Sequence, residues 1–290
     1  MRLYAFIVHG FALLTLLFLS PTVTSCRLDL TGLVYTAADP DRRFGQSMSY
    51  NAQSGYSSIS APSESYTLYV VADMHVDAKN IHTLDTFINQ YKADAQTLPL
   101  WICLGDVVNG KGLYPMVEEH LLPISDRKVF ATVGNHDLYF SEWDQWLALF
   151  KTSSYWFEIV TPSGKKDLFV SMDSGGASLG NEQTKWLRSL LAGKKGQYRH
   201  VTCFTHTNFW KRELMGSTGY YSVEETYSLA SLFANNGVEL VLTGHDHIRS
   251  ENIFSGVTYH ILGCLKPADE CGYTIYTYGD TIERKYVSVK

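Results

Sequence analysis

In the stretch Leu98-Pro-Leu-Trp-Ile-Cys-Leu-Gly-Asp106, a run of apolar residues ends abruptly at a glycine and a carboxylate. Apolar runs of about five to eight residues that are bounded by turn signals are typical of buried strands. The same pattern recurs along the chain, and each run ends on Asp, Asn or His. The further runs cover residues 67–73, 129–135, 200–206 and 238–245.

Amphipathic segments lie between these runs and predict helices. In residues 80–91, for example, Leu84, Phe87 and Ile88 recur at helical spacing. Strands that alternate with helices indicate an α/β architecture, in which ligands bind beyond the carboxyl ends of the strands. The polar residues that end the apolar runs are therefore expected to converge. The other expected helices cover residues 141–150, 181–191 and 223–235.

Three more strands are expected at residues 168–173, 257–262 and 273–278. The last two are joined through a short loop that is flanked by Cys264 and Cys271, which favours an antiparallel pair. The sequence has no internal repeat and no sign of a second domain, so we expect one domain. Eight strands in one domain suggest two packed sheets.

The composition is that of a globular protein with a sizeable core. The chain has 290 residues, of which 45% are hydrophobic and 13% aromatic, and this excludes global disorder. The 24 Lys and Arg residues are outnumbered by 29 Asp and Glu residues, giving a formal net charge of -5. An acidic balance argues against a nucleic-acid partner that is bound through its phosphates.

The N-terminus has the pattern of an export signal over residues 1–25, with Arg2 before an apolar core at residues 11–19. The residues Val23-Thr24-Ser25-Cys26 resemble a relaxed bacterial lipobox. That resemblance implies cleavage before Cys26, acylation of its thiol and new amino group, and attachment to a membrane of the bacterial cell envelope, at its periplasmic or surface face. The alternative is ordinary secretory cleavage, which leaves the protein secreted.

Residues 26–65 are polar and are predicted to form an anchor and tether segment ahead of a domain at residues 66–290. One short helix is expected within the tether, over residues 43–50, with Phe44, Met48 and Tyr50 facing inward. Cys103 and Cys203 lie inside apolar runs and are expected to be buried free thiols. A disulfide between Cys264 and Cys271 is left open, because spacing alone does not establish its geometry.

The residues that end the strands have the chemistry of metal ligands. An extended chain places residues i and i+2 on one face about 7 Å apart, so both members of such a pair can reach one cation. Carboxylate, carboxamide and imidazole groups suit first-row divalent metals, and the set is too large for one tetrahedral ion. The set consists of Asp73, His75, Asp106, Asn135, His206, His245 and His247.

The order of these blocks resembles the calcineurin-like metallophosphoesterase superfamily. The blocks are Asp73-x-His75, Gly105-Asp106, Gly134-Asn135-His136-Asp137, His206 and Gly244-His245-Asp246-His247. The resemblance runs from about residue 67 to the C-terminus, and it implies a four-layer α/β/β/α sandwich of two mixed sheets with the site at one edge.

The resemblance also implies a role for each ligand. One divalent metal would be bound by Asp73, His75, Asp106 and His247, and a second by Asp106, Asn135, His206 and His245, with Asp106 as the bridge. The metals would be manganese, iron or zinc, and the nucleophile would be a bridging hydroxide that attacks a small phosphoester substrate.

Residues beside the ligands acquire implied roles as well. His136 resembles the residue that stabilises or protonates the leaving oxygen, and Asp137 would fix the tautomer of His136 and raise its basicity. Substrate contacts are expected from Asn109, Asn135 and His136.

Departures from related subclasses narrow the expected activity. Asn109 stands where purple acid phosphatases carry a metal-binding tyrosine, and residues 107–110 lack the phosphate-gripping arginine of protein phosphatases. Residues 172–187 are similar to compact members that include phosphodiesterases. We therefore expect a phosphoesterase that favours phosphodiesters over monoesters. The alternative is a catalytically silent scaffold lipoprotein of the same fold. The sequence gives no indication of the oligomeric state.

Overall fold

The computed structural model of the chain describes residues 39–94, 97–210, 219–267 and 270–289. All of them belong to one compact unit, Tyr35–Lys290. The expected signal peptide and Cys26 lie outside the described residues. Within the described ranges, no helix is both long enough and apolar enough to cross a membrane.

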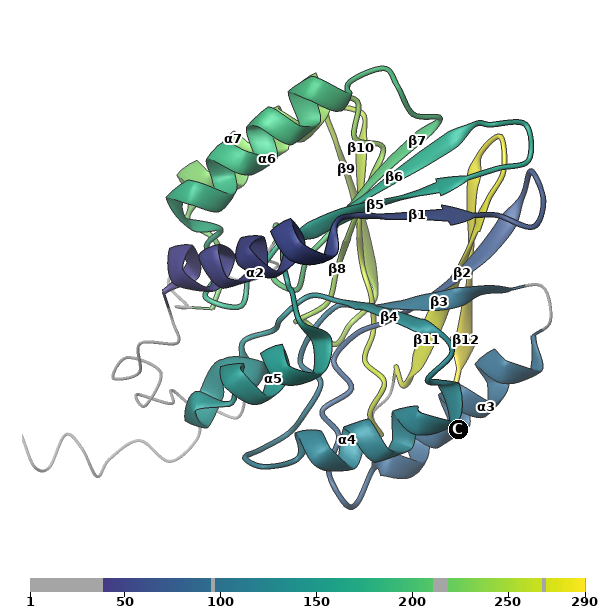
Figure 1. Cartoon of the computed structure of the whole chain (residues 1–290). Coiled ribbons are helices and arrows are strands. Elements are labelled where there is room, and N and C mark those ends of the chain that lie inside the picture. The colour runs from purple at the N-terminus through teal and green to yellow at the C-terminus, as the bar shows by residue number, and fades with distance from the viewer. Residues whose placement is uncertain (1–38, 95–96, 211–218, 268–269, 290) are drawn as a thin grey trace, which may run out of the picture. The chain divides into compact units, whose positions relative to one another are not determined.

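Two mixed β-sheets form the centre of this unit (Figure 1). In spatial order, the larger sheet contains β1 (Ser57–Ser60), β5 (Tyr155–Val160), β6 (Lys166–Ser171), β7 (His200–Phe204), β8 (Leu240–Thr243), β10 (Val257–Ile261) and β9 (Ser250–Phe254). The smaller contains β12 (Ile282–Ser288), β11 (Gly272–Tyr278), β2 (Tyr66–Val71), β3 (Thr97–Cys103) and β4 (Lys128–Ala131). Neighbours among β6, β7, β8 and β10 pair in parallel, as do neighbours among β2, β3 and β4.

Helices cover the outer face of each sheet. The larger sheet packs against α2 (Pro40–Ser54), α6 (Gly180–Lys194) and α7 (Val223–Asn235), and the smaller against α3 (Ile81–Ala93), α4 (Tyr114–Leu121) and α5 (Trp143–Phe150) (Figure 1). One buried cluster lies between the sheets and one lies under each helical layer. The predicted four-layer α/β/β/α sandwich is therefore confirmed.

Burial on both faces explains why the central strands are almost continuously apolar. In β2, Leu68 and Val70 pack between the sheets, whereas Tyr69 and Val71 pack under the helices of the smaller sheet. Successive side chains of a strand point to opposite faces, and a strand that is covered on both sides needs apolar residues at every position.

The structure contains all eight predicted strands, together with β1, β5, β9, β12 and the helix α4, which the sequence pattern did not reveal. The predicted antiparallel pairing of the strands on either side of the Cys264–Cys271 loop is wrong. Strand β10 pairs with β8 and β9, whereas β11 pairs with β2 and β12 in the other sheet. A short loop can cross between two packed sheets as readily as it can turn a hairpin, and spacing does not distinguish the two. All four of the described cysteines are buried free thiols.

Helix α2 is part of the packed structure. Asp39 caps it by accepting hydrogen bonds from the backbone amides of Asp41 and Arg42 at 3.0 and 3.2 Å. The helix is longer than the predicted 43–50 segment, and its inward side differs, because Tyr50 is 39% exposed. Strand β1 follows and pairs with β5 at the edge of the larger sheet. The structure thus places a helix and a strand within the segment that the sequence assigned to a tether. The buried residues of α2 are Arg43, Phe44, Ser47 and Asn51.

A buried ion pair fixes α2 to the domain. Arg43 donates from Nε and Nη2 to the two carboxylate oxygens of Asp173 at 2.8 and 2.9 Å, and both side chains are buried. The hydroxyl of Ser153 and the amide of Gly175 also donate to Asp173. A buried charge pair of this kind strongly destabilises the fold when one partner is removed, because the other charge is left unpaired.

We expect Arg43→Met to lower the free energy of unfolding by roughly 3–5 kcal/mol, because the Asp173 carboxylate would lose its counter-charge. Urea denaturation measures the difference. The matched control is Lys185→Met, which removes an ion pair with Glu182 on the exposed side of α6 and should cost less than about 1 kcal/mol. Equal effects of the two substitutions would contradict the assigned role of Arg43.

Candidate metal centre

All seven predicted ligands come together at one edge of the sandwich. Each lies in a loop that follows the carboxyl end of a parallel strand, namely β2, β3 or β4 of the smaller sheet and β7 or β8 of the larger one. The site is therefore built by both sheets. The loops carry Asp73 and His75, Asp106, Asn135, His206, and His245 and His247, in that order.

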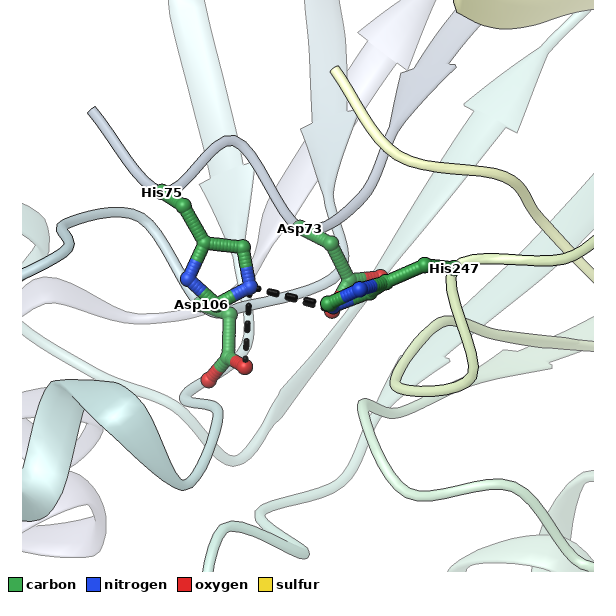
Figure 2. A group of neighbouring side chains, drawn as sticks. All are labelled: Asp73, His75, Asp106 and His247. Atoms are coloured by element: carbon green, nitrogen blue, oxygen red, sulfur yellow. Dashed lines mark hydrogen bonds and ion pairs between the residues drawn. The ribbon is translucent and has the colours of Figure 1, made fainter. Parts of the chain in front are cut away.

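The first ligand set consists of Asp73, His75, Asp106 and His247 (Figure 2). Their ligand atoms all lie within 4.8 Å of one another. The Nε2 atoms of His75 and His247 are 3.1 Å apart, and His247 Nε2 is 3.3 Å from Asp73 Oδ1. Two nitrogens and two carboxylates therefore face one small volume.

The second ligand set consists of Asp106, Asn135, His206 and His245. Asn135 Oδ1 lies 3.0 Å from His206 Nε2 and 3.0 Å from His245 Nδ1. Asp106 Oδ2 lies 3.4 Å from His206 Nε2 and 3.6 Å from His75 Nε2 in the first set. The two sets thus share the Asp106 carboxylate, as a bridging ligand requires.

The charges and hydrogen bonds of these residues fit divalent cations. Asp73 is completely buried, and apart from the 3.3 Å contact with His247 Nε2 its Oδ1 has no hydrogen-bond partner among the described residues. Burial lowers the pKa of His75 to about 3, and burial together with His206 lowers the pKa of His245 to about 4. Although burial opposes it, the neighbouring histidines hold the pKa of Asp106 below its ordinary value. Neutral imidazoles and ionised carboxylates are the forms that bind metals.

Hydrogen bonds outside the ligand sets orient two of the ligands. His206 Nδ1 lies 2.8 Å from the Leu104 carbonyl, which leaves its Nε2 lone pair for a metal. The side-chain amide of Asn135 donates to the Tyr139 hydroxyl at 3.0 Å, which turns Asn135 Oδ1 toward the other ligands. The sequence did not separate Tyr139 from ordinary packing aromatics. Its position four residues after Asn135 was the only signal.

Two of the motif glycines are needed because ligand loops touch at these positions. A Cβ on Gly134 would lie 2.2 Å from Asp106 Oδ1, and one on Gly244 would lie 2.4 Å from Asp73 Oδ2. Several ligands also adopt the left-handed backbone region, which costs non-glycine residues about 1–3 kcal/mol each. These are Asp73, His75, Asp106, His245 and His247, with φ between 43° and 76°.

The predicted role of Asp137 is wrong. Its carboxylate accepts hydrogen bonds from the amides of Asp106, Val107 and Gly134 at 2.8–2.9 Å and from the Tyr114 hydroxyl at 2.7 Å. Within the described residues it makes no bond to the imidazole of His136. Burial and the Asp106 charge raise the pKa of Asp137 to about 7, and the hydrogen bonds from Gly134, Tyr114 and Val107 oppose that rise. Asp137 therefore joins the loops after β3 and β4.

Substrate contacts were predicted for Asn109 and His136 as well as for Asn135. In the structure, Asn109 and His136 lie at different places. The His136 ring is partly buried and perpendicular to His75, with 4.6 Å between centroids. Its backbone amide donates to Asp106 Oδ1 at 2.8 Å, and burial lowers the pKa of its imidazole. Asn109 is exposed, and its side chain donates to Asp77 at 3.2 Å.

A group of hydrogen bonds that the sequence analysis did not predict holds the loop that carries His245 and His247. Asp246 accepts hydrogen bonds from Asn208 and from the Tyr220 hydroxyl, both at 2.6 Å. The Tyr220 ring lies 4.8 Å from the ring of His245. Asn208 stands two residues after His206, so the two histidine loops of the larger sheet are tied together.

Residues 66–249 match the family model for calcineurin-like phosphoesterases. The chain belongs to the calcineurin-like phosphoesterase family. The match includes every residue of both ligand sets. The family uses a dimetal centre, which agrees with the two ligand sets of this phosphoesterase.

No curated protein sequence matches the phosphoesterase. Among solved structures, a dimetal phosphatase from Danio rerio is 12% identical, with a TM-score of 0.61 over 78% of this chain and 96% of that one. The purple acid phosphatase PPD1 from yellow lupin is 13% identical, with a TM-score of 0.59 over 78% and 52%. GAP50 of Plasmodium is 14% identical, with a TM-score of 0.58 over 78% and 85%. At these identities the likeness shows a shared fold.

We expect Gly134→Ala to weaken metal binding by about 10–100-fold, the range seen when a group that supports a ligand is disturbed. The added methyl would displace the Asp106 carboxylate from both ligand sets. Metal titration followed by elemental analysis measures the change. Gly193→Ala is the control, because a Cβ there meets nothing within 4 Å in helix α6. Unchanged metal affinity in Gly134→Ala would show that the close approach is not needed.

Proposed function

We propose that the protein is a metal-dependent phosphoester hydrolase, with phosphodiesters preferred over monoesters. The observation that carries the proposal is the Asp106 carboxylate, which lies within 3.6 Å of histidine ligands from both sets. Two sets that share one carboxylate provide for two cations at a short separation. The family membership supports the same class of reaction.

Two divalent cations in these sets would supply a water of lowered pKa and a positive charge for the phosphate. The chain's own residues do the rest. Asp73 and Asp106 balance part of that charge, and Asn135 holds its oxygen toward the second set through its bond to Tyr139. His136 lies beside His75 at the first set, where its imidazole can donate a hydrogen bond to the leaving oxygen of the substrate.

The preference for diesters rests on what surrounds the site. No arginine follows Asp106 in residues 107–110, so that loop offers no fixed cation to a monoester dianion. A phosphodiester carries one negative charge and needs less compensation. Two aromatic rings flank the ligands, Tyr139 beside His136 and Tyr220 beside His245, and can contact the organic groups of a diester.

The second candidate is a catalytically silent scaffold. One of the similar structures, GAP50, is described as the anchor in the inner membrane complex of Plasmodium. Against this candidate, each of the seven ligand positions carries a residue that can bind metal, and the positions converge. Activity measurements separate the two candidates.

For Asp106→Asn we expect loss of metal from both sets and a fall in turnover of at least about 100-fold, because the shared ligand loses its charge. The assay compares an aryl phosphodiester with an aryl phosphomonoester, using manganese-loaded protein. Faster diester turnover that disappears in the variant supports the proposal. If wild type and variant are equally inert on both substrates, the scaffold candidate replaces it.

His136→Ala should lower kcat by roughly 10²–10⁴-fold while metal content stays at the wild-type level, because His136 is expected to act on the leaving group and not on the metals. Steady-state kinetics and elemental analysis of the same sample provide both readings. Metal loss in this variant would instead place His136 among the ligands. A substrate with a better leaving group should recover part of the lost rate.

We also propose export and lipid attachment at Cys26, supported by the resemblance of residues 23–26 to a lipobox. Cys26→Ser should move the protein from the membrane fraction to the soluble fraction, because the acyl chains provide the anchor. Detergent-phase partition and mass spectrometry of the mature N-terminus test this. An unmodified Cys26 in the wild-type protein would leave ordinary secretion as the better account.

A further inference from the structure

A polar cavity of about 380 Å³ lies at the edge of the sandwich where β9 and β12 end the two sheets. None of the residues of the two ligand sets lines it. Both sheets contribute charged side chains to its wall. The lining residues used below are Arg249, Glu251, His260, Glu270 and Arg284. The wall also includes Tyr286, and the Arg249 guanidinium lies over its ring, 3.6 Å from the centroid.

Strand register shows that three of these side chains point between the sheets. Glu251 pairs with His260 across β9 and β10, and Arg284 pairs with Tyr276 across β11 and β12. Residues opposite each other in an antiparallel pair project to the same face. Tyr276 belongs to the buried cluster between the sheets, and its hydroxyl contacts His260 Nδ1. Inner faces of packed sheets are normally apolar, so charged residues at these positions need an explanation.

Each arginine has a glutamate partner but keeps unused donors. Arg249 Nε is 3.4 Å from Glu270, and Arg284 Nη2 contacts Glu251. A guanidinium has five N–H donors. Among the described residues, no further hydrogen bond is made by the side chain of either arginine. Both pairs are partly exposed, and exposed pairs contribute little to stability. Intersheet ion pairing alone therefore explains the arrangement poorly.

His260 adds an uncharged polar group to the wall of the cavity. Only 7% of the residue is exposed, and it lines the cavity. One ring nitrogen is taken by Tyr276, and the other, Nε2, has no partner among the described residues. Burial and the two arginines lower the pKa of His260 to about 4, so the ring is neutral.

We propose that this cavity binds a small zwitterion, a molecule that carries one oxyanion and one ammonium group. The lining has two positive and two negative side chains, and the imidazole adds no charge. An anion alone would gain the guanidinium donors but would also face both carboxylates. A zwitterion can give its oxyanion to the arginines and its ammonium to the glutamates. The volume is within the range of small-molecule sites.

Isothermal titration of the metal-loaded protein tests the proposal with two matched sets of probes. Glycine is compared with acetate and glycinamide, and phosphoethanolamine with phosphate and ethanolamine. We expect at least one zwitterion to bind about tenfold more tightly than either of its single-charge controls, as the loss of one charged hydrogen bond predicts. The set that contains the tighter zwitterion shows whether the oxyanion is a carboxylate or a phosphate.

The double variant Glu251→Gln with Arg284→Gln distinguishes binding in the cavity from binding at the metals. It removes one charge of each sign from the cavity and keeps polar groups there. The binding heat that comes from ligand in the cavity should disappear in this variant, whereas the heat of binding at the metals should persist. The matched control is Glu182→Gln with Lys185→Gln, an exposed pair on α6. If the cavity variant does not fold, the imidazole resonances of His260 in the wild-type protein provide the reading, and they should shift with the zwitterion.

Three results would overturn the proposal. One is the absence of saturable binding by both zwitterions. Another is equal affinity for a zwitterion and its single-charge control, which would indicate a simple ion site. The last is binding that survives in the cavity variant or leaves the His260 resonances unmoved, which would place the ligand elsewhere.

Discussion

Two sheets end at the same edge of the sandwich, and the Asp106 carboxylate lies where their ligands meet. Its Oδ2 is 3.6 Å from His75, on a loop of the smaller sheet, and 3.4 Å from His206, on a loop of the larger one. A buried carboxylate is costly unless positive charge or hydrogen-bond donors face it. The amide of His136 supplies one such donor to the other oxygen. The rest of the negative charge of Asp106 can be balanced by bound cations. Because Asp106 belongs to both ligand sets, those cations would be held by loops from both sheets.

This arrangement imposes strain that the surrounding loops must hold. Several ligands adopt left-handed backbone conformations, and Gly134 and Gly244 leave no room for a Cβ beside the two carboxylates. Asp137 opposes this strain with four hydrogen bonds: two come from amides of the loop after β3, one from its own loop after β4 and one from Tyr114 of α4. Asp246 performs a similar function for the histidine loops of the larger sheet. Ligand positions are thus fixed by loop-to-loop hydrogen bonds rather than by the strands alone.

Local pattern in the sequence predicted the strands, the α/β class and the cluster of metal-binding residues, whereas the four-layer arrangement was implied by the family resemblance. Apolar runs mark strands buried on two faces, and the polar residue at the end of each run marks the sheet edge. Pairing between distant segments leaves no such mark. The role of Asp137 depends on amides 30 and 31 residues away along the chain, and the sheet that β11 joins depends on β2. Short strands at sheet edges, such as β1, carry too few apolar residues to be recognised.

Side chains that point between the two sheets differ in character between the central strands and the edge strands β9 and β12. Between the sheets, inward positions of the central strands are filled by Leu68, Phe157 and Phe169. At β9 and β12 the same inward positions carry Glu251 and Arg284. Edge strands have a neighbour on one side only, so water reaches their inward side chains and a charged side chain there keeps part of its hydration. Charged residues at this edge line a polar cavity. Charged side chains on edge strands also discourage pairing of the edges with other chains.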